Sequence, residues 1–175
     1  MNKAIFFDRD GTLVKLVWRD IKNAHTAPWN REEFEVLPGV GDALQKSSNA
    51  GFKNLVISNQ PDILDGFIQP EDCVYFSFYL MTTFAIEDIF ESYRRGAWTY
   101  KPNPGHVDIA KEKYNLDLKM CYFVGDTWKD CVCAALRDIP YVHIGSNNPI
   151  GPVVHRSKSV AGAVDWIIAD DNDEV

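Results

Sequence analysis

Short apolar runs alternate with amphipathic stretches along most of this chain, and this alternation constrains the fold more than any other feature. Strands are predicted at residues 4–7, 52–57, 86–93, 120–124 and 141–144, and helices at residues 40–50, 69–84, 104–114, 128–136 and 159–168. Alternating strands and helices with short connections form a parallel sheet that helices cover on both faces. The sequence therefore predicts an α/β fold, a Rossmann-like three-layer sandwich around a central, mainly parallel sheet.

One domain is predicted over residues 1–169, because a chain of 175 residues has about the size of a single compact unit. The stretches of chain between the motifs described below are too short for a large cap domain. Residues 15–35 interrupt the alternation with a polar, aromatic-rich excursion or small hairpin, in which Trp18 and Trp29 either pack under the loop or contact a substrate. Residues 170–175 are predicted to form an acidic, solvated tail.

Asp8 and Asp10 directly follow the first predicted strand. Residues i and i+2 of an extended chain point the same way, so the two carboxylates can converge on one site. Burying them costs free energy unless they are paired or bind a cation. A turn in which both side chains bond the local backbone is the structural alternative. Gly11 allows the turn that follows.

Three further motifs follow later strands. Ser58 and Asn59 come after the second strand, where a hydroxyl and nearby backbone N–H groups can bind an anion. Lys101 precedes a predicted helix, and Asp126 ends the fourth strand with Asp130 one helical turn further on. Each motif alone also fits a structural role, such as a turn, a surface lysine or a helix cap. Because ligands bind at the carboxyl ends of parallel strands, the motifs are together predicted to form one site.

Carboxylates, one hydroxyl and one lysine at a single sheet edge favour phosphoryl chemistry. Oxygen ligands of this kind suit Mg²⁺, which typically binds a few carboxylates together with phosphate and water. Carboxylates alone would repel a phosphate, whereas Mg²⁺, Lys101 and Ser58 together make an anion clamp for phosphoryl transfer. The expected partner is a small phosphorylated molecule.

The chain resembles the haloacid-dehalogenase-like phosphohydrolase superfamily, which has these motifs in the same order. The resemblance runs from about residue 3 to residue 144 and rests on residues 8–12, 58–60, 101–105, 125–126 and Asp130. The Asp-Arg-Asp-Gly-Thr and Ser-Asn-Gln forms resemble in particular the branch of heptose-bisphosphate and histidinol-phosphate phosphatases. This resemblance implies a Mg²⁺-dependent phosphatase that hydrolyses a phosphomonoester of a small metabolite, such as a sugar phosphate, through an aspartyl-phosphate intermediate.

The resemblance also implies a role for each motif residue. Asp8 would be the nucleophile, and Asp10 would protonate the leaving oxygen and then activate water. Asp8, the Asp10 backbone carbonyl and Asp126 would bind Mg²⁺. Asp130 would orient Lys101 or a metal-bound water. The residues expected to bind phosphate or to support the site are Ser58, Asn59, Lys101 and Thr12.

Departures from this branch leave the natural substrate open. The relatives often carry a Cys/His zinc loop before the Lys-Pro motif, but residues 89–100 contain neither Cys nor His, so no structural zinc is predicted. Tyr100 stands where the heptose enzymes typically have Arg, and Pro61-Asp62-Ile63 replaces their Ser-Gly-Ile segment. The roles of residues 15–35 and of Tyr100 in specificity stay open.

Two alternative functions compete with the metabolite phosphatase. A net charge of -7 argues against a nucleic-acid 3′-phosphatase, because a nucleic-acid partner favours a basic surface. A non-catalytic domain that only binds a phosphorylated ligand, or another partner, does not need two spaced aspartates plus a third carboxylate. Turnover of phosphorylated substrates would discriminate among the three.

Cysteine usage and hydropathy predict a cytoplasmic protein with no membrane association. Cys73, Cys121, Cys131 and Cys133 form no CxxC pair, as expected of small buried thiols in a reducing compartment. The N-terminal residues lack the apolar region of a signal peptide, and no apolar stretch approaches the roughly 20 residues of a membrane span. The oligomeric state is open, with a slight preference for a monomer.

Overall fold

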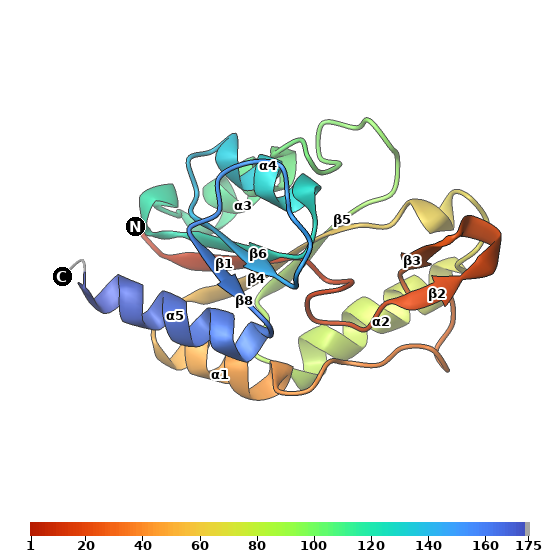
Figure 1. Cartoon of the computed structure of the whole chain (residues 1–175), viewed down its shortest axis with the longest axis horizontal. Helices are drawn as coiled ribbons and strands as arrows, with labels where there is room; N and C mark the ends of the chain where they lie inside the picture. Colours follow the sequence, from red (N-terminus) through yellow and green to blue (C-terminus); the bar gives the residue numbers. More distant parts are fainter. Residues whose placement is uncertain (174–175) are drawn as a thin grey trace.

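A computed structural model describes residues 1–173, and in this part of the chain a six-stranded parallel sheet lies between two layers of helices (Figure 1). The order across the sheet is β5–β4–β1–β6–β7–β8. In chain order these strands are β1 (Ala4–Phe7), β4 (Lys53–Asn59), β5 (Asp88–Ser92), β6 (Tyr122–Gly125), β7 (Tyr141–Ile144) and β8 (His155–Ser157). The predicted α/β sandwich is thereby confirmed.

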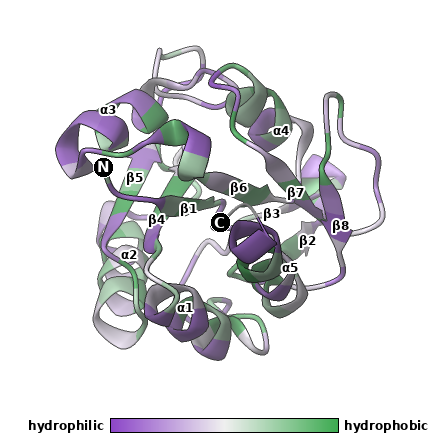
Figure 2. Cartoon of the chain, turned by 90° about the vertical axis from the view of Figure 1, so that its left-hand side faces the viewer, coloured by the Kyte–Doolittle hydropathy of each residue, from purple (hydrophilic) through white to green (hydrophobic). Residues whose placement is uncertain are grey.

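Helices cover both faces of the sheet. α1 (Val40–Asn49) and α5 (Val160–Asp173) pack against each other on one face, and α3 (Gly105–Tyr114) and α4 (Trp128–Ala135) cover the opposite face (Figure 2). α2 (Pro70–Thr83) packs against the edge strand β5. None of the helices within residues 1–173 is long and apolar enough to cross a membrane.

Strand β1 is buried on both faces, which explains its unbroken apolar run. Ile5 and Phe7 belong to the hydrophobic cluster formed with α1 and α5, while Ala4 and Phe6 belong to the cluster formed with α3 and α4. Successive strand residues point to opposite faces, so each cluster receives every second side chain. With β4 and β6 on either side of β1, the carboxyl ends of three central strands meet at one edge.

The segment 15–35 contains a small hairpin, one of the two forms expected for it. Its strands β2 (Val17–Arg19) and β3 (Ala24–Thr26) pair antiparallel, with the 3₁₀ helix η1 (Asp20–Lys22) between them. Two other short 3₁₀ helices are η2 (Pro61–Ile63) and η3 (Leu118–Met120). In Figure 1 the hairpin lies beyond the sheet edge, over α2.

Two elements differ from the sequence-based expectation. β8 has no apolar run to predict it, and it joins the sheet as an edge strand through pairing with β7. α5 continues through Asp173, into the segment expected as an acidic tail, because Asp170 accepts a hydrogen bond from Tyr122 and Asp171 pairs with Lys3. The last two residues of that expected tail, 174–175, lie outside the described part of the chain.

Candidate active site

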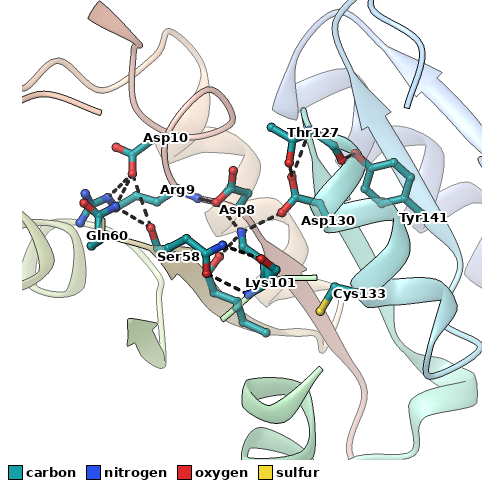
Figure 3. Close-up of polar contacts among 12 residues, drawn as sticks. Asp8, Arg9, Asp10, Ser58, Gln60, Lys101, Thr127, Asp130, Cys133 and Tyr141 are labelled. Atoms are coloured by element: carbon teal, nitrogen blue, oxygen red, sulfur yellow. Dashed lines mark hydrogen bonds and ion pairs between the residues drawn. The ribbon is translucent and has the colours of Figure 1, made fainter. Parts of the chain in front are cut away.

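Asp8 lies immediately beyond the carboxyl end of β1, the strand at the centre of the sheet. Its Oδ1 accepts hydrogen bonds from the Arg9 backbone N–H at 2.8 Å and from Lys101 Nζ at 2.6 Å (Figure 3). Gly11 has a φ of +94°, and a Cβ there would lie 2.2 Å from Asp126 Oδ2. Only glycine suits both this backbone conformation and this close approach, so the turn after β1 brings Asp126 next to Asp8.

Lys101 is the buried cation of the site. Its Nζ lies 2.6 Å from Asp8 Oδ1, 2.7 Å from Asp130 Oδ1 and 2.6 Å from the Ile57 carbonyl oxygen. Burial lowers the pKa of Lys101, but the two carboxylates outweigh burial and raise it above its ordinary value. An ammonium group has three donors, so a phosphate oxygen that bonds Lys101 directly would have to replace one of these three partners.

Asn59 positions the backbone of Lys101. Its Nδ2 donates to the Lys101 carbonyl and its Oδ1 accepts from the Lys101 N–H, both at 2.9 Å. These reciprocal bonds occupy the Asn59 amide and join the end of β4 to the loop that carries the lysine. The contact between Asn59 and a phosphate stays a prediction.

Asp130 is fully buried in the first turn of α4 and has both carboxylate oxygens engaged. Oδ2 accepts from the Thr127 N–H at 3.0 Å and from Thr127 Oγ1 at 2.6 Å, which closes a capping box. Oδ1 pairs with Lys101. A Cβ on Gly125 would lie 2.6 Å from the Asp130 Cβ, so glycine makes room for this helix start. Asp130 therefore contacts Lys101 directly, and its role in orienting that lysine stays a prediction.

Asp8 and Asp126 make the site suitable for a divalent cation. Carboxylate oxygens of Asp8, Asp126 and Asp130 lie within 4.8 Å of one another. The Oδ1 atom of Asp126 is buried and has no partner among the described residues, and burial followed by the Asp8 charge raises the pKa of Asp126. Because both oxygens of Asp130 are engaged, Asp8 and Asp126 are the side chains available to Mg²⁺. A hard cation would relieve their repulsion, so this donor set fits the ion.

Asp10 lies on the other side of Asp8, within a separate group of donors. Its Oδ2 accepts from Arg9 Nε at 3.0 Å, Gln60 Nε2 at 2.5 Å and Ser58 Oγ at 3.4 Å (Figure 3). Ser58 is fully buried, and its hydroxyl also accepts from Gln60 at 2.8 Å. The structure thus places Ser58 beside Asp10, and its contact with a phosphate stays a prediction.

Thr12 lies apart from these groups. It is fully buried, its hydroxyl has no partner among residues 1–173, and it lines a different cavity formed by the 37–40 and 158–160 segments. No side-chain hydrogen bond within residues 1–173 therefore links Thr12 to the site, and its predicted supporting role stays a prediction. Sequence reasoning also left three residues of the site without a role, namely Arg9, Gln60 and Glu91. The first two lie inside motifs quoted for the resemblance, whereas Glu91 is a charged residue within a strand.

A cavity of about 260 Å³ opens above these carboxylates. Asp8, Asp10, Lys101 and Asp126 line this cavity, and the remaining lining residues are segments 25–27 and 59–62 with Leu16, Tyr100, Thr127 and Lys129. All of the predicted catalytic and metal-binding side chains therefore border one cavity.

The hairpin wall of the cavity is held by Asp62. This carboxylate accepts from Trp29 Nε1 at 2.7 Å and pairs with Lys22 at 2.6 Å. Trp29 also stacks on Phe67, with ring centroids 4.4 Å apart. Trp29 therefore packs under the loop, while Trp18 packs on His25, a residue that lines the cavity.

Comparison with known proteins supports a haloacid-dehalogenase-like phosphatase. No protein-family model matches the chain. A curated relative from Escherichia coli O6:H1, D-glycero-beta-D-manno-heptose-1,7-bisphosphate 7-phosphatase, is 26% identical over 181 residues, which cover 94% of this chain and 88% of the relative. The sequence-based resemblance to the heptose-bisphosphate phosphatase branch and the predicted class of enzyme are thereby confirmed.

Solved structures share the fold. The D,D-heptose 1.7-bisphosphate phosphatase from B. bronchiseptica, complexed with magnesium and phosphate, matches with a TM-score of 0.78 and 19% identity, covering 97% of this chain and 99% of that one. The 3-deoxy-D-manno-octulosonate 8-phosphate phosphatase from Moraxella catarrhalis, in complex with magnesium, phosphate and KDO, matches with a TM-score of 0.61 and 15% identity, covering 98% and 88%. At these identities the likeness describes the fold.

Proposed function

We propose that this chain is a Mg²⁺-dependent phosphatase that hydrolyses a phosphomonoester of a small metabolite, such as a sugar phosphate. The observation that carries the proposal is the Lys101 ammonium group held between Asp8 and Asp130, with Asp126 beside them, where the central strands end. A structural ion pair needs only one carboxylate for each cation. Here Lys101 already has two, and Asp126 adds a third whose Oδ1 has no hydrogen-bond partner within residues 1–173. Sugar-phosphate phosphatases among the similar proteins support the substrate class.

Asp8 acts as the nucleophile in this mechanism. A carboxylate oxygen of Asp8 attacks phosphorus, the bond from phosphorus to the leaving oxygen breaks, and Asp10 gives its proton to that oxygen. Asp10 then takes a proton from a water molecule that attacks the aspartyl-phosphate, and the bond from phosphorus to Asp8 breaks to release phosphate. Lys101 keeps positive charge beside Asp8 throughout. When bound by Asp8 and Asp126, Mg²⁺ supplies charge neutralisation for the phosphoryl oxygens.

Free buried thiols support a reducing location such as the cytoplasm. All four cysteines are buried and none is in a disulfide. This agrees with the expectation for intracellular chains, in which thiols persist in reduced form.

Turnover on a substrate panel with and without Mg²⁺ tests the proposal. The panel contains sugar phosphates, the heptose bisphosphate named for the relatives, nucleotides and 3′-phosphorylated oligonucleotides. We expect the fastest turnover on a sugar phosphate, no turnover after chelation of Mg²⁺, and a loss of at least about 1,000-fold in Asp8→Asn. Asp165→Asn, which alters an exposed carboxylate on α5, is the matched control and retains activity.

Other outcomes overturn the proposal. Fastest turnover on the 3′-phosphorylated oligonucleotide would favour a nucleic-acid 3′-phosphatase. Binding of phosphorylated ligands without turnover of any of them would favour a non-catalytic binding domain. Full activity in Asp8→Asn would remove the nucleophile from the mechanism.

A further inference from the structure

Arg9 forms a second buried charge cluster next to the one around Lys101. Its side chain is fully buried, and its Nε lies 3.0 Å from Asp10 Oδ2 (Figure 3). Its Nη1 lies 3.0 Å from Glu91 Oε1. Arg9 is not among the residues that line the cavity, so its side chain acts on a substrate only through a neighbour. A guanidinium group is costly to bury, and here two carboxylates compensate for its charge.

Glu91 is the second carboxylate that binds Arg9. It lies on β5, directly opposite Ser58 of β4. Its Oε1 accepts from Arg9, from Ser77 Oγ at 3.0 Å and from Cys73 Sγ at 3.4 Å, and its Oε2 accepts from Tyr93 OH at 3.1 Å. Two of these donors come from α2 and one from the end of the sheet. The carboxylate is therefore fixed to two rigid elements, and through it the guanidinium is fixed as well.

The two oxygens of Asp10 have different surroundings. Three donors, from Arg9, Gln60 and Ser58, converge on Oδ2. Oδ1 is buried and accepts from no group among residues 1–173. One oxygen is thus anchored, and the other is left for proton transfer. The donors on Oδ2 also stabilise the negative charge that stays on Asp10 once its proton has left.

We propose that the Arg9–Glu91 pair, together with Gln60, is a positioning device for Asp10 that keeps Oδ1 directed at the leaving oxygen. The inference rests on the proposed phosphatase function and assigns these residues a part in one step of it. In that step the proton moves from Oδ1 to the leaving oxygen while the bond between phosphorus and that oxygen breaks, and the oxygen keeps the electron pair of the broken bond. Arg9 and Glu91 are positioning residues, because only Asp10 touches the reacting atoms.

Two aryl phosphates with similar shapes test the assignment. The nitro group of p-nitrophenyl phosphate makes the leaving phenolate stable without protonation, whereas phenyl phosphate depends more strongly on an acid. The value of kcat/KM reports the step in which the leaving group departs. For Arg9→Met we expect kcat/KM to fall about 100-fold on phenyl phosphate, and less than about tenfold on p-nitrophenyl phosphate, because only acid catalysis is impaired.

Two more variants separate positioning from folding. Glu91→Gln keeps the shape of the side chain and removes its charge, so we expect the same selective loss at smaller size. Arg137→Met removes the ion pair with Asp108, away from the cavity, and leaves both substrates unaffected. Thermal unfolding of each variant measures the folded fraction during the assay.

The outcomes are distinct. Equal losses on both substrates, or losses that follow the folded fraction, would make Arg9 and Glu91 purely structural and overturn the inference. A wild type that hydrolyses neither aryl phosphate with Mg²⁺, nor any member of the wider panel, would overturn the proposed function and this inference with it.

Discussion

Two buried cations of this protein each lie between two carboxylates, yet they are placed for different tasks. Lys101 lies between Asp8 and Asp130 and lines the cavity. Arg9 lies between Asp10 and Glu91 and is sealed from the cavity. Both pairs of carboxylates stabilise a cation that burial alone would disfavour. The difference lies in what each cation contacts, because Lys101 borders the cavity while Arg9 contacts Asp10, one of the residues that line it.

The chemistry of the two side chains fits this division. An ammonium group is a compact charge that can follow a phosphoryl group as its bonds rearrange, while a planar guanidinium fixes two acceptors in a set geometry. Lys101 is held by main-chain and helix-start contacts from Asn59 and Asp130. Arg9 is held by a strand carboxylate, Glu91. A compact ammonium group therefore lies beside Asp8 and a planar guanidinium group beside Asp10.

Replacement of the cavity-lining cation has the largest expected effect. Lys101→Met removes the charge beside Asp8 and leaves two buried carboxylates without their partner. We expect kcat/KM to fall about 1,000-fold on p-nitrophenyl and phenyl phosphate alike, and the free energy of unfolding to fall by about 3 kcal/mol. Enzyme assays and denaturant unfolding measure these losses.

The matched control is Lys46→Met, which removes an exposed pair with Asp165 and changes stability by less than about 1 kcal/mol. If Lys101→Met were selective for phenyl phosphate, in the manner expected of Arg9→Met, the division between the two cations would fail.

The effect of Mg²⁺ on stability should also distinguish the two clusters. The pKa of Asp126 is raised by burial and then by Asp8, so without metal the folded chain takes up a proton at Asp126 above the ordinary pKa, and stability falls as pH rises through this window. We therefore expect Asp126→Asn to be more stable than the wild type at pH 8 in metal-free buffer. With Mg²⁺ at about 100 times its Kd, the wild type gains about 2.7 kcal/mol.

Thermal unfolding with and without Mg²⁺ checks this prediction. Arg9→Met should keep the gain in stability, because its cluster contains neither Asp8 nor Asp126. Asp126→Asn should lose it. A gain from Mg²⁺ that survives in Asp126→Asn would mean that the ion binds elsewhere.

The inner strands β1, β4, β6 and β7 could be predicted from the sequence because they are buried on both faces. Runs such as 4–7 and 120–124 have no reason to be apolar other than burial between two helical layers. Strand β8 was not predicted because its three residues are polar and the middle one, Arg156, is exposed, so its place depends on pairing with β7 rather than on burial. The continuation of α5 through Asp173 depends on tertiary contacts to Tyr122 and Lys3, which no local pattern encodes.

The candidate site was predictable where charged residues follow the carboxyl ends of strands. Asp8, Asp126 and Lys101 follow strands whose carboxyl ends must meet, so their proximity follows from topology. The contacts of Asn59 and Ser58 were not predictable, because an amide or hydroxyl in a motif can serve the ligand or the protein equally well. Glu91 was missed since its partner Arg9 is 82 residues away along the chain.

His106 gives the test with the smallest expected effect. Of the two buried cations, Lys101 is the one that lowers the pKa of His106. His106 is 8% exposed on α3, and burial followed by the charge of Lys101 lowers its pKa to about 4. The unfolded chain takes up a proton near pH 6.5, while the folded chain does so only near pH 4, so stability falls as pH decreases through this window.

We expect the contribution of His106 to the free energy of unfolding to fall by about 2 kcal/mol between pH 7 and pH 5. Denaturant unfolding of the wild type and of His106→Phe at both pH values isolates this contribution. In the Lys101→Met background it should shrink, because one cause of the lowered pKa is gone, and in the Arg9→Met background it should stay the same. An equal change in both backgrounds would mean that the two buried cations share one electrostatic environment, and the distinction between them would then rest on contact geometry alone.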